Sequence, residues 1–561
     1  MNAVRYLLFG ALAVVAYLLI LAWNRDYTPG VADAPAPAET TAPQNSDLPQ
    51  PANAATSADL LTTTPDAPPT AATDQPTAAV SSTRAIRVTT DVLHVAIDPV
   101  GGDLVYAALP QYPETLDRPD APFVVLERDG RTFHIAQSGL VGPQGPDANA
   151  SGRPLYSASA TDYELAPGQE ELVVPLAYTS PEGVYIEKRF RFRRDSHLVS
   201  VEYSIHNQGN TPWEANLFAQ LKRDMSPDPA AQNAGFGVST YLGPALYTPD
   251  EKYKKVDFKD VRKTPLNQRI EGGWIAMVQH YFVAAWIPNP AHTYLYQMRP
   301  TSDDRYTIVG FTGPRLEVAP QATATASAQL YIGPKVQDRL APISPGLELT
   351  IDYGWLWFIA QPLFWLLDFI HGIVGNWGVA IVLLTLLVKA AFFQLSATSY
   401  RSMAKMRQLQ PKMMELRDRH GSDRQKLSQA TMELYRKEKV NPLGGCLPIL
   451  VQMPVFIALY WTLMESVELR HASFLWIRDL SALDPYFILP ILMGVSMYVQ
   501  QHLNPAPPDP TQARIMKLMP IAMTVFFLWF PAGLVLYWVV NNLLSIAQQW
   551  YITRQIERAA A

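Results

Sequence analysis

Long apolar segments in the last third of the chain constrain its fold more than any other feature. A helix of about 20 apolar residues crosses the roughly 30 Å hydrocarbon core of a bilayer, because each residue adds about 1.5 Å. The segments predicted to span are residues 377–393, 447–464, 486–500, 516–530 and 534–551. Charged residues make up only 17% of the chain, against about 25% in soluble proteins. The chain is therefore predicted to be an α-helical membrane protein.

A further apolar segment, residues 6–23, follows Arg5 near the N-terminus. Its length predicts a transmembrane anchor over residues 1–26. A cleaved signal peptide is the alternative, since residues 32–34 (Ala-Asp-Ala) resemble a cleavage site. That triplet lies well past the apolar segment, and Pro35 follows it directly, so the anchor is favoured. The prediction is six transmembrane helices in all.

Residues 27–83 are rich in Ala, Thr, Asp and Pro and have no apolar periodicity. Ten prolines occur between Pro29 and Pro76. Such a stretch cannot bury enough apolar surface to offset the entropy lost on ordering, so a disordered periplasmic tether is predicted.

The next part of the chain, residues 84–341, alternates between apolar and polar residues as half-buried strands do. The clearest alternating runs are residues 86–97, 184–193, 197–205, 305–311 and 321–332. Turn-forming residues separate the runs, and no amphipathic helices alternate with them. The pattern predicts one large all-β sandwich rather than an α/β domain.

Two further regions follow the β domain. Residues 342–375 are predicted to be a linker and an interfacial amphipathic helix, because the aromatic-rich segment 355–370 is interrupted by Gln361, Pro362 and Asp368. Residues 376–561 are predicted to hold five of the spans and a cytoplasmic helical hairpin.

The distribution of charge predicts the orientation in the membrane. Residues 397–440 carry eleven Lys and Arg against five Asp and Glu, whereas residues 24–388 carry 26 basic and 39 acidic residues. Short basic loops stay in the cytoplasm. Both termini, residues 397–440 and residues 504–512 are therefore predicted to be cytoplasmic, with the β domain in the periplasm.

Lys389 is the exceptional residue of the predicted spans, because it lies deep within the apolar run 377–393. A cation near the bilayer centre costs at least about 2.5 kcal/mol. One interpretation is that the side chain reaches to the cytoplasmic interface. The other is that Lys389 faces a polar, water-filled cavity together with Thr385, which lies one helical turn earlier on the same face.

Polar residues of the other spans are candidates for the lining of such a cavity. The predicted lining residues are Gln452, Ser496, Thr524 and Asn541, with further polar positions at Thr462, Gln500, Asn542, Ser545, Gln548 and Gln549. Hydrogen bonding between neighbouring helices is the alternative role for each of them.

The basic segment 397–440 is predicted to form two helices, over about residues 399–419 and 423–439. Ser422 and Gln425 form a capping-box pattern at the start of the second helix. One interpretation is a self-contained helical pair with a solvated basic surface. The other adds a contact to RNA phosphate or anionic lipid. The residues predicted to make that contact are Arg407, Arg417, Arg419 and Arg424.

Several function classes are disfavoured by what the sequence does not contain. It has no Walker-type phosphate loop, no intramembrane chain of acidic residues and no recognisable catalytic triad. Its one cysteine, Cys446, excludes an intrachain disulfide and a cysteine-based zinc site. The chain is predicted not to be an enzyme and to use no cofactor, no metal and no small-molecule substrate.

Two alternative functions remain open from the residues alone. A membrane-tethered carbohydrate-active or carbohydrate-binding protein would have to use polar residues of the β domain, such as His94, His134, His197 and Glu202. No spacing among them supports a site. A channel for small solutes is the other alternative.

The last 200 or so residues also carry a family resemblance. Four stretches, SMAKMRQLQPKMMELRDRHG, YRKEKVNPLGGCLPILVQMPVFIALYWTLMESVELR, DPYFILPILMGVSMY and FFLWFPAGLVLYWVVNN, resemble the YidC family of membrane-protein insertases. The resemblance covers about residues 352–554. The anchor and the large periplasmic domain resemble the Gram-negative form of that family.

The resemblance implies a site and a mechanism. The core helices of this family enclose a hydrophilic groove whose cation attracts the polar part of a client while the client's apolar helix moves into lipid. Lys389 stands where the family usually has arginine. Thr385, Tyr537 and Trp538 stand where the family contacts nascent chains, and Trp538 replaces a usual second tyrosine. The family's periplasmic domain resembles sugar-binding super-sandwiches.

The resemblance also implies partners and a location. They are nascent membrane proteins, the ribosome, the Sec translocon and the lipid bilayer of the inner membrane. Many members have a strongly basic tail that contacts the ribosome. This chain ends in RQIERAAA, so docking through such a tail is not expected.

Overall fold

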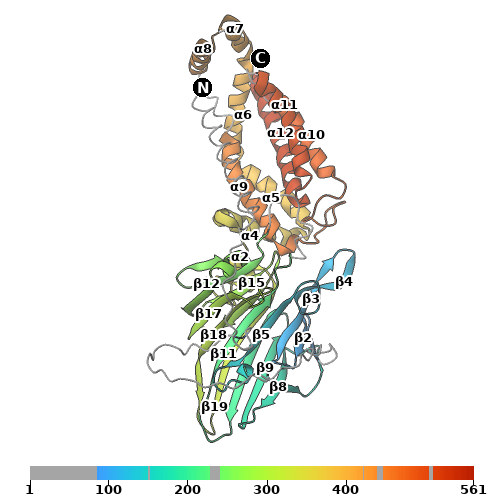
Figure 1. Ribbon diagram of the computed structural model, residues 1–561. Coiled ribbons are helices and arrows are strands. Elements are labelled where there is room, and N and C mark those ends of the chain that lie inside the picture. The colour runs from blue at the N-terminus through green and yellow to red at the C-terminus, as the bar shows by residue number, and fades with distance from the viewer. Residues whose placement is uncertain are drawn as a thin grey trace, which may run out of the picture.

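The computed structural model describes residue 48 and residues 85–149, 152–227, 240–420, 423–438, 447–503 and 510–560. Figure 1 shows two parts that meet end to end, a β domain and a group of long helices. The predicted anchor (1–26), the tether (27–83) apart from residue 48, and the proposed cap Ser422 lie outside the described residues.

The β domain consists of two large sheets. The first contains ten strands, in the spatial order β14 (Leu266–Glu271), β17 (Thr293–Pro300), β18 (Thr307–Val318), β11 (Trp213–Arg223), β5 (His134–Val141), β4 (Arg118–Glu127), β3 (Asp103–Thr115), β2 (His94–Asp98), β1 (Ile86–Thr89) and β7 (Asp162–Glu164). The second contains nine, in the order β13 (Lys252–Lys255), β12 (Gly243–Thr248), β15 (Trp274–Val278), β16 (Phe282–Pro288), β19 (Thr323–Pro334), β10 (Leu198–Asn207), β9 (Val184–Arg193), β8 (Glu171–Thr179) and β6 (Ser157–Ala158).

A continuous apolar core between these sheets accounts for the sandwich. Val199, Val201, Tyr203 and Ile205 of β10 are buried at every second position, because successive side chains of a strand point to opposite faces. Residues of both sheets share this core. The predicted all-β sandwich is therefore confirmed.

The run 86–97, predicted as one alternating segment, is two strands. β1 and β2 pair antiparallel, with Ile86 opposite Ile97. Thr90 closes the turn, because its Oγ1 accepts hydrogen bonds from the backbone N–H groups of Val92 (3.3 Å) and Leu93 (2.9 Å). The alternation shifts by one residue at this turn, because the adjacent Val92 and Leu93 are both buried. The segment is therefore not one continuous alternating run.

Nine longer helices follow the β domain within the described residues. Their bounds are α4 (Trp357–Val374), α5 (Trp377–Ala391), α6 (Phe393–Gln408), α7 (Gln410–His420), α8 (Arg424–Lys437), α9 (Leu447–Glu465), α10 (Ile488–Leu503), α11 (Pro510–Phe527) and α12 (Ala532–Ala560). Shorter helical segments are η2 (Pro146–Ala148), α2 (Phe258–Lys263), α3 (Gln337–Leu340), η4 (Leu347–Thr350), η5 (Gly354–Leu356) and η7 (Val467–Leu469).

The segment predicted to lie in the membrane interface has the properties of a membrane span. Among the described residues, Gly354–Val374 is the one helical segment that is by itself long and apolar enough to cross a bilayer. A second candidate exists if α5 and α6, which meet at an angle of 67°, count as one broken helix. The six-span arrangement therefore stays a prediction.

The predicted cytoplasmic hairpin differs from the structure in its first helix. α6 starts at Phe393, directly after α5, and a break at Leu409 separates it from α7. α7 and α8 form the hairpin, at the end of the helices farthest from the β domain (Figure 1). Asp423 caps α8, since its carboxylate accepts from the backbone N–H groups of Gln425 and Lys426, both at 3.1 Å.

The β domain contacts the helices through the segment that ends α9. Lys335, just after β19, forms an ion pair of 2.7 Å with Glu465. The ring Nε2 of His280, in the β15–β16 turn, lies 2.9 Å from the carbonyl oxygen of Met464. These contacts hold one end of α9 against the sandwich.

Candidate functional site

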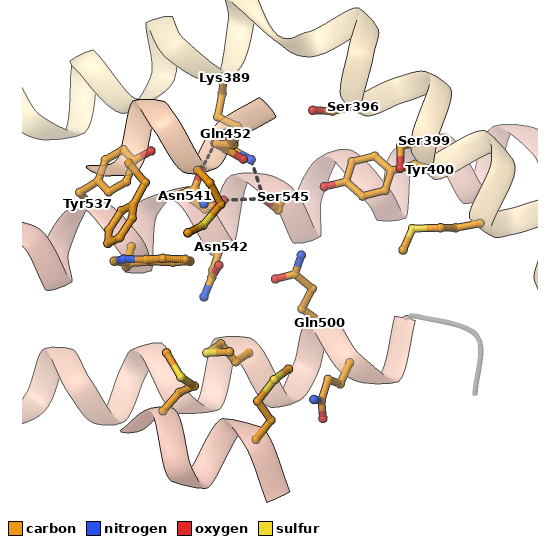
Figure 2. A pocket seen from close by; sticks show the side chains of 18 residues that line it. Lys389, Ser396, Ser399, Tyr400, Gln452, Gln500, Tyr537, Asn541, Asn542 and Ser545 are labelled. Atoms are coloured by element: carbon orange, nitrogen blue, oxygen red, sulfur yellow. Dashed lines mark hydrogen bonds between the residues drawn. The ribbon is translucent and has the colours of Figure 1, made fainter. Parts of the chain in front are cut away.

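A cavity of about 530 Å³ lies between the long helices. Eighteen residues line it, and they come from α5, α6, α9, α10, α11 and α12. Figure 2 shows Lys389 and Gln500 on opposite sides of this cavity. We call it the helical cavity.

Lys389 contributes the positive charge of the helical cavity. Its side chain is only 8% exposed, and its Nζ donates a 2.7 Å hydrogen bond to Oγ of Ser545 on α12 (Figure 2). Ser545 in turn donates to the carbonyl oxygen of Asn541 at 2.7 Å. No carboxylate is among the described residues that line the cavity. The described hydrogen-bond partner of this ammonium is therefore a neutral hydroxyl.

Amide side chains hold the polar wall in place. Nε2 of Gln452 on α9 donates to Oδ1 of Asn541 on α12 at 2.7 Å (Figure 2). One turn of α12 separates Asn541 from Ser545, so both lie on the same face of that helix. Nδ2 of Asn542 donates to Oγ of Ser496 on α10 at 3.2 Å. The polar groups thus bridge helices and also face the cavity, which combines the two roles expected from sequence.

Aromatic residues line another part of the helical cavity. Tyr537 is 1% exposed and stacks with Phe456 of α9 at 6.3 Å between ring centroids. The indole of Trp538 meets the same ring edge-to-face at 4.8 Å. Nε1 of Trp538 is buried and has no hydrogen-bond partner among the described residues. Such a buried donor without a partner is an exception in a folded protein.

Five of the predicted site residues line the helical cavity together: Lys389, Gln452, Tyr537, Trp538 and Asn541. Three do not. Thr385 is buried and donates to the carbonyl oxygen of Ile381 in its own helix at 2.7 Å. Ser496 supports Asn542 from behind the lining. Thr524 donates to the carbonyl oxygen of Pro520 at 2.7 Å. A Cβ at Gly494 would collide with Oγ1 of Thr524, so this threonine serves close packing of α10 and α11.

Gln500, Asn542 and Ser545, the further polar positions named from sequence, also line the cavity. The lining residues that were not predicted are Ser396, Ser399, Tyr400, Met403, Met453, Phe456, Met497, Gln501, Met519 and Met523. The spacing of Ser396, Ser399, Tyr400 and Met403 by three or four residues marks one face of a helix. The predicted span ends at residue 393 and the predicted hairpin begins at residue 397, so the sequence does not predict a cavity-lining helix here. The cavity instead continues along α6.

The predicted hairpin residues lie outside the helical cavity. Arg407 is an exposed residue near the end of α6. Arg417 and Arg419 are exposed on α7, and Arg424 is the first residue of α8. Lys412 and Glu438 form an exposed ion pair of 2.6 Å that connects the two arms of the hairpin.

The residues considered for a carbohydrate site do not form one. His134 lies on β5, and burial lowers its pKa to about 3. His197 precedes β10 in the other sheet, and burial lowers its pKa to about 4. Glu202 pairs with Arg189 and Arg191, while His94 lines a different cavity at the edge of the sandwich. Buried neutral imidazoles in separate sheets are typical of packing.

Comparison with known proteins assigns both parts of the chain. Residues 85–366 match the family model described as YidC periplasmic domain, and residues 369–559 match the one described as 60Kd inner membrane protein. A curated relative from Pseudomonas fluorescens (strain SBW25), named membrane protein insertase YidC, is 56% identical and covers 100% of this chain and 99% of its own length. A relative of the same name from Stutzerimonas stutzeri (strain A1501) is 57% identical, with both chains fully covered.

A solved structure is also similar to this chain. It is described as an active YidC insertase crystal structure with the first transmembrane domain resolved. It shares 18% sequence identity and covers 84% of this chain and 93% of its own, with a TM-score of 0.38. The assignment therefore rests on sequence. Two family models that together cover most of the chain, and relatives above 50% identity over its full length, show that it belongs to the YidC family of membrane protein insertases.

Proposed function

We propose that the chain inserts client transmembrane segments into the inner membrane through the helical cavity. The single observation that carries this proposal is the position of Lys389, a buried cation whose described hydrogen-bond partner is the neutral Ser545. Burial of a charge without a counterion is costly. A water-filled groove that receives polar or acidic segments accounts for why such a residue is tolerated.

The two sides of the cavity suit the two parts of a client. α5 and α12 present Lys389, Asn541, Asn542 and Ser545, whereas α10 and α11 present Met497, Met519 and Met523 beside the amides of Gln500 and Gln501. Polar groups lower the cost of moving a client's polar segment across the hydrocarbon. Methionine side chains are flexible and polarisable and accept varied apolar shapes. The client's apolar helix then enters lipid, which gains about 0.8 kcal/mol per buried CH₂.

The proposed arrangement in the membrane has six spans with both ends of the chain in the cytoplasm. It divides the chain into an anchor (1–26), a periplasmic tether (27–83), a periplasmic super-sandwich (84–341), a linker and interfacial helix (342–375), and the insertase core (376–561). The net charge of +6 over residues 397–440, from eleven basic and five acidic residues, supports a cytoplasmic hairpin.

The proposed partners beyond clients and lipid are the ribosome and the Sec translocon. Arg407, Arg417, Arg419 and Arg424 are proposed to contact ribosomal RNA or anionic lipid. Exposure of the first three favours such contacts. Thr385, Ser496 and Thr524 are proposed to support the cavity lining, and Gln452, Tyr537, Trp538 and Asn541 to contact the client directly.

Reconstitution tests the proposal. The purified full chain is placed in liposomes, and a short single-span client is synthesised outside them. Protection of the client's translocated end from added protease measures insertion. Insertion by the wild type and by the surface variant Lys259→Ala, together with a marked loss in Lys389→Glu, is expected. Insertion that is equal with and without the protein would reject the function, and passage of small solutes instead would indicate a channel.

A further inference from the structure

A second cavity, of about 500 Å³, lies between the β domain and the helices. One wall is the tip of the β3–β4 hairpin, which projects from the edge of the sandwich toward the helices (Figure 1). The other wall is the segment between α9 and α10. We call it the junction cavity. None of its lining residues lines the helical cavity.

Guanidinium groups from separate segments converge on Glu114 at this hairpin tip. Arg118 lies 2.7 Å and Arg131 3.9 Å from the Glu114 carboxylate. Nη2 of Arg470, from the segment after α9, donates to the carbonyl oxygen of Glu114 at 2.9 Å. Arg470 is also held over the rings of Phe123 and Phe282, at 5.4 and 5.8 Å from their centroids. Its guanidinium is therefore fixed at the junction rather than free in solvent.

Positive charge exceeds negative charge around the junction cavity. Four arginines line it, with Arg478 as the fourth, against the carboxylates of Glu114, Asp117 and Asp479. The single carboxylate of Glu114 forms ion pairs with both Arg118 and Arg131. Asp479 is engaged by the backbone N–H and the hydroxyl of Ser481, at 2.8 and 2.7 Å.

The accessible arginines can reach a bound anion. Arg478 is exposed and has no hydrogen bond or ion pair within the described part of the chain. Arg118 and Arg131 are 58% and 77% exposed. This basic lining contrasts with residues 24–388, where acidic residues outnumber basic ones by 39 to 26. The excess of arginine at this cavity is therefore local and does not reflect the overall charge of the domain.

The junction cavity lies at the level where lipid headgroups are expected. Met464 lines it one residue before α9 ends, and Ala482 lines it shortly before α10 begins. The same connection exposes Leu475 (76%), Tyr486 (67%) and Phe487 (44%). Exposed aromatic and apolar residues at the ends of spans are typical of the membrane–water interface. A lipid with an anionic headgroup would place that headgroup against the arginines and its acyl chains against the exposed apolar residues.

We propose that the junction cavity binds the phosphodiester headgroup of an anionic phospholipid of the outer leaflet. Arginine suits this ligand, because its planar guanidinium donates two parallel hydrogen bonds to phosphate oxygens. The lipid bridges the β3–β4 hairpin and the α9–α10 connection and so fastens the β domain to the membrane surface. The inference rests on the proposed topology, which places this connection on the periplasmic side.

Lipid retention by the purified full chain tests the inference. Native mass spectrometry from a neutral detergent counts bound lipids after addition of phosphatidylglycerol or, separately, phosphatidylcholine. The wild type and the control Arg305→Gln, a surface variant outside the cavity, are expected to retain phosphatidylglycerol preferentially. Arg131→Gln/Arg478→Gln is expected to lose that retention by roughly ten-fold or more, because charge-assisted hydrogen bonds to phosphate are removed. Arg131→Lys/Arg478→Lys should retain part of it.

The competing explanations predict different results. Equal retention of phosphatidylglycerol by the wild type and the double glutamine variant would overturn the inference, as would equal retention of the two lipids by the wild type. Displacement of the lipid by inorganic phosphate at the same concentration would assign the cavity to a free anion, and displacement by a glutamate-rich peptide would assign it to an acidic protein segment. The assay measures no insertion, so its failure leaves the proposed function untouched.

Discussion

The Lys335 ammonium lies 2.7 Å from the Glu465 carboxylate, and the two side chains are only 2% and 5% exposed. Nζ of Lys335 also donates to the carbonyl oxygen of Thr350 at 3.2 Å. The pair joins the end of β19, the linker and the end of α9. Each charge is buried, so each depends on the other.

Removal of one member of this pair is expected to destabilise the protein strongly. Lys335→Met or Glu465→Gln should each lower the free energy of unfolding by roughly 3–5 kcal/mol, because the remaining polar group stays buried without its ionic partner. The double variant Lys335→Met/Glu465→Gln should cost less than the sum of the two single variants. Thermal unfolding of the four proteins in detergent measures the coupling. Strictly additive losses would contradict the expected interdependence.

The stability of the junction between the two parts should depend on pH through Glu468. Burial, and to a smaller extent the charges of Asp368 and Asp338, raises the pKa of Glu468 from 4.5 to about 7. The folded protein therefore binds more protons than the unfolded chain between these two values, and stability should fall as the pH rises from about 4.5 to 7. The total change is at most about 3 kcal/mol.

Glu468→Gln isolates this contribution. The glutamine variant should lose the part of the pH dependence that falls between pH 4.5 and 7. The control Asp250→Asn, which amidates an exposed acid of the β12–β13 turn, should keep it. Melting temperature is recorded across that pH range for the three proteins. Identical pH profiles for the wild type and Glu468→Gln would show that this carboxyl does not titrate there.

Substitutions of Lys389 should discriminate between clients by their charge. A matched pair of clients is needed, one with Asp and Glu in the translocated segment and one with Asn and Gln. Lys389→Arg should retain insertion of both, and Lys389→Ala should impair the acidic client more. Lys389→Glu should be worst for the acidic client, since two like charges 4 Å apart repel by about 4 kcal/mol at an effective dielectric constant of about 20.

Protease protection of the two clients in proteoliposomes gives the comparison. Lys259→Ala, which removes an exposed lysine of α2 in the β domain, is the control. Equal defects for both clients would show that Lys389 supports the structure of the helical cavity and does not attract client carboxylates.

Charge reversals at the end of α6 and in the hairpin should weaken contacts with ribosomes or anionic lipid in a salt-dependent way. Arg407→Glu/Arg417→Glu/Arg419→Glu is expected to lower co-sedimentation with ribosomes or with anionic vesicles at low salt. The difference should shrink at high salt, because exposed charges are screened. A triple reversal in the β domain, Arg305→Glu/Lys259→Glu/Lys263→Glu, provides the same change in charge. If the hairpin variant binds as the wild type does at low salt, the hairpin is a structural brace.

Much of the architecture could be predicted from the sequence, because its elements have clear periods. β9 begins at Val184 and ends at Arg193, as the alternation of that run predicted. The break before α12 lies at Pro531, where proline and glycine were expected to interrupt the helix. The turn at Thr90 and the break at Leu409 were missed. Each carries only a short local signal. Val92 and Leu93 are adjacent and both buried, which interrupts the strand alternation. Pro411 lies in the first turn of α7, a position that proline favours at the start of a helix.

The candidate site could be predicted in part. Polar residues within apolar segments can be found from the sequence, but the sequence does not show which way their side chains point. Lys389 and Asn541 were found as polar residues in apolar segments, and both line the helical cavity. Thr385 shares a helix face with Lys389 in an ideal helix, yet its hydroxyl bonds to Ile381. The residues that α6 adds to the cavity lining depend on its 67° bend from α5. The local sequence does not predict that angle.

The contacts between the β domain and α9 have a mechanical consequence. Glu465, Met464 and Arg470 all lie within one short stretch of chain at the end of that helix. A pull or twist applied to the sandwich would be passed to α9 before any other helix of the cavity. Gln452, Met453 and Phe456, which α9 contributes to the lining, would then shift relative to Asn541. A protein that binds the β sheets far from the membrane could therefore change the shape of the cavity wall through α9.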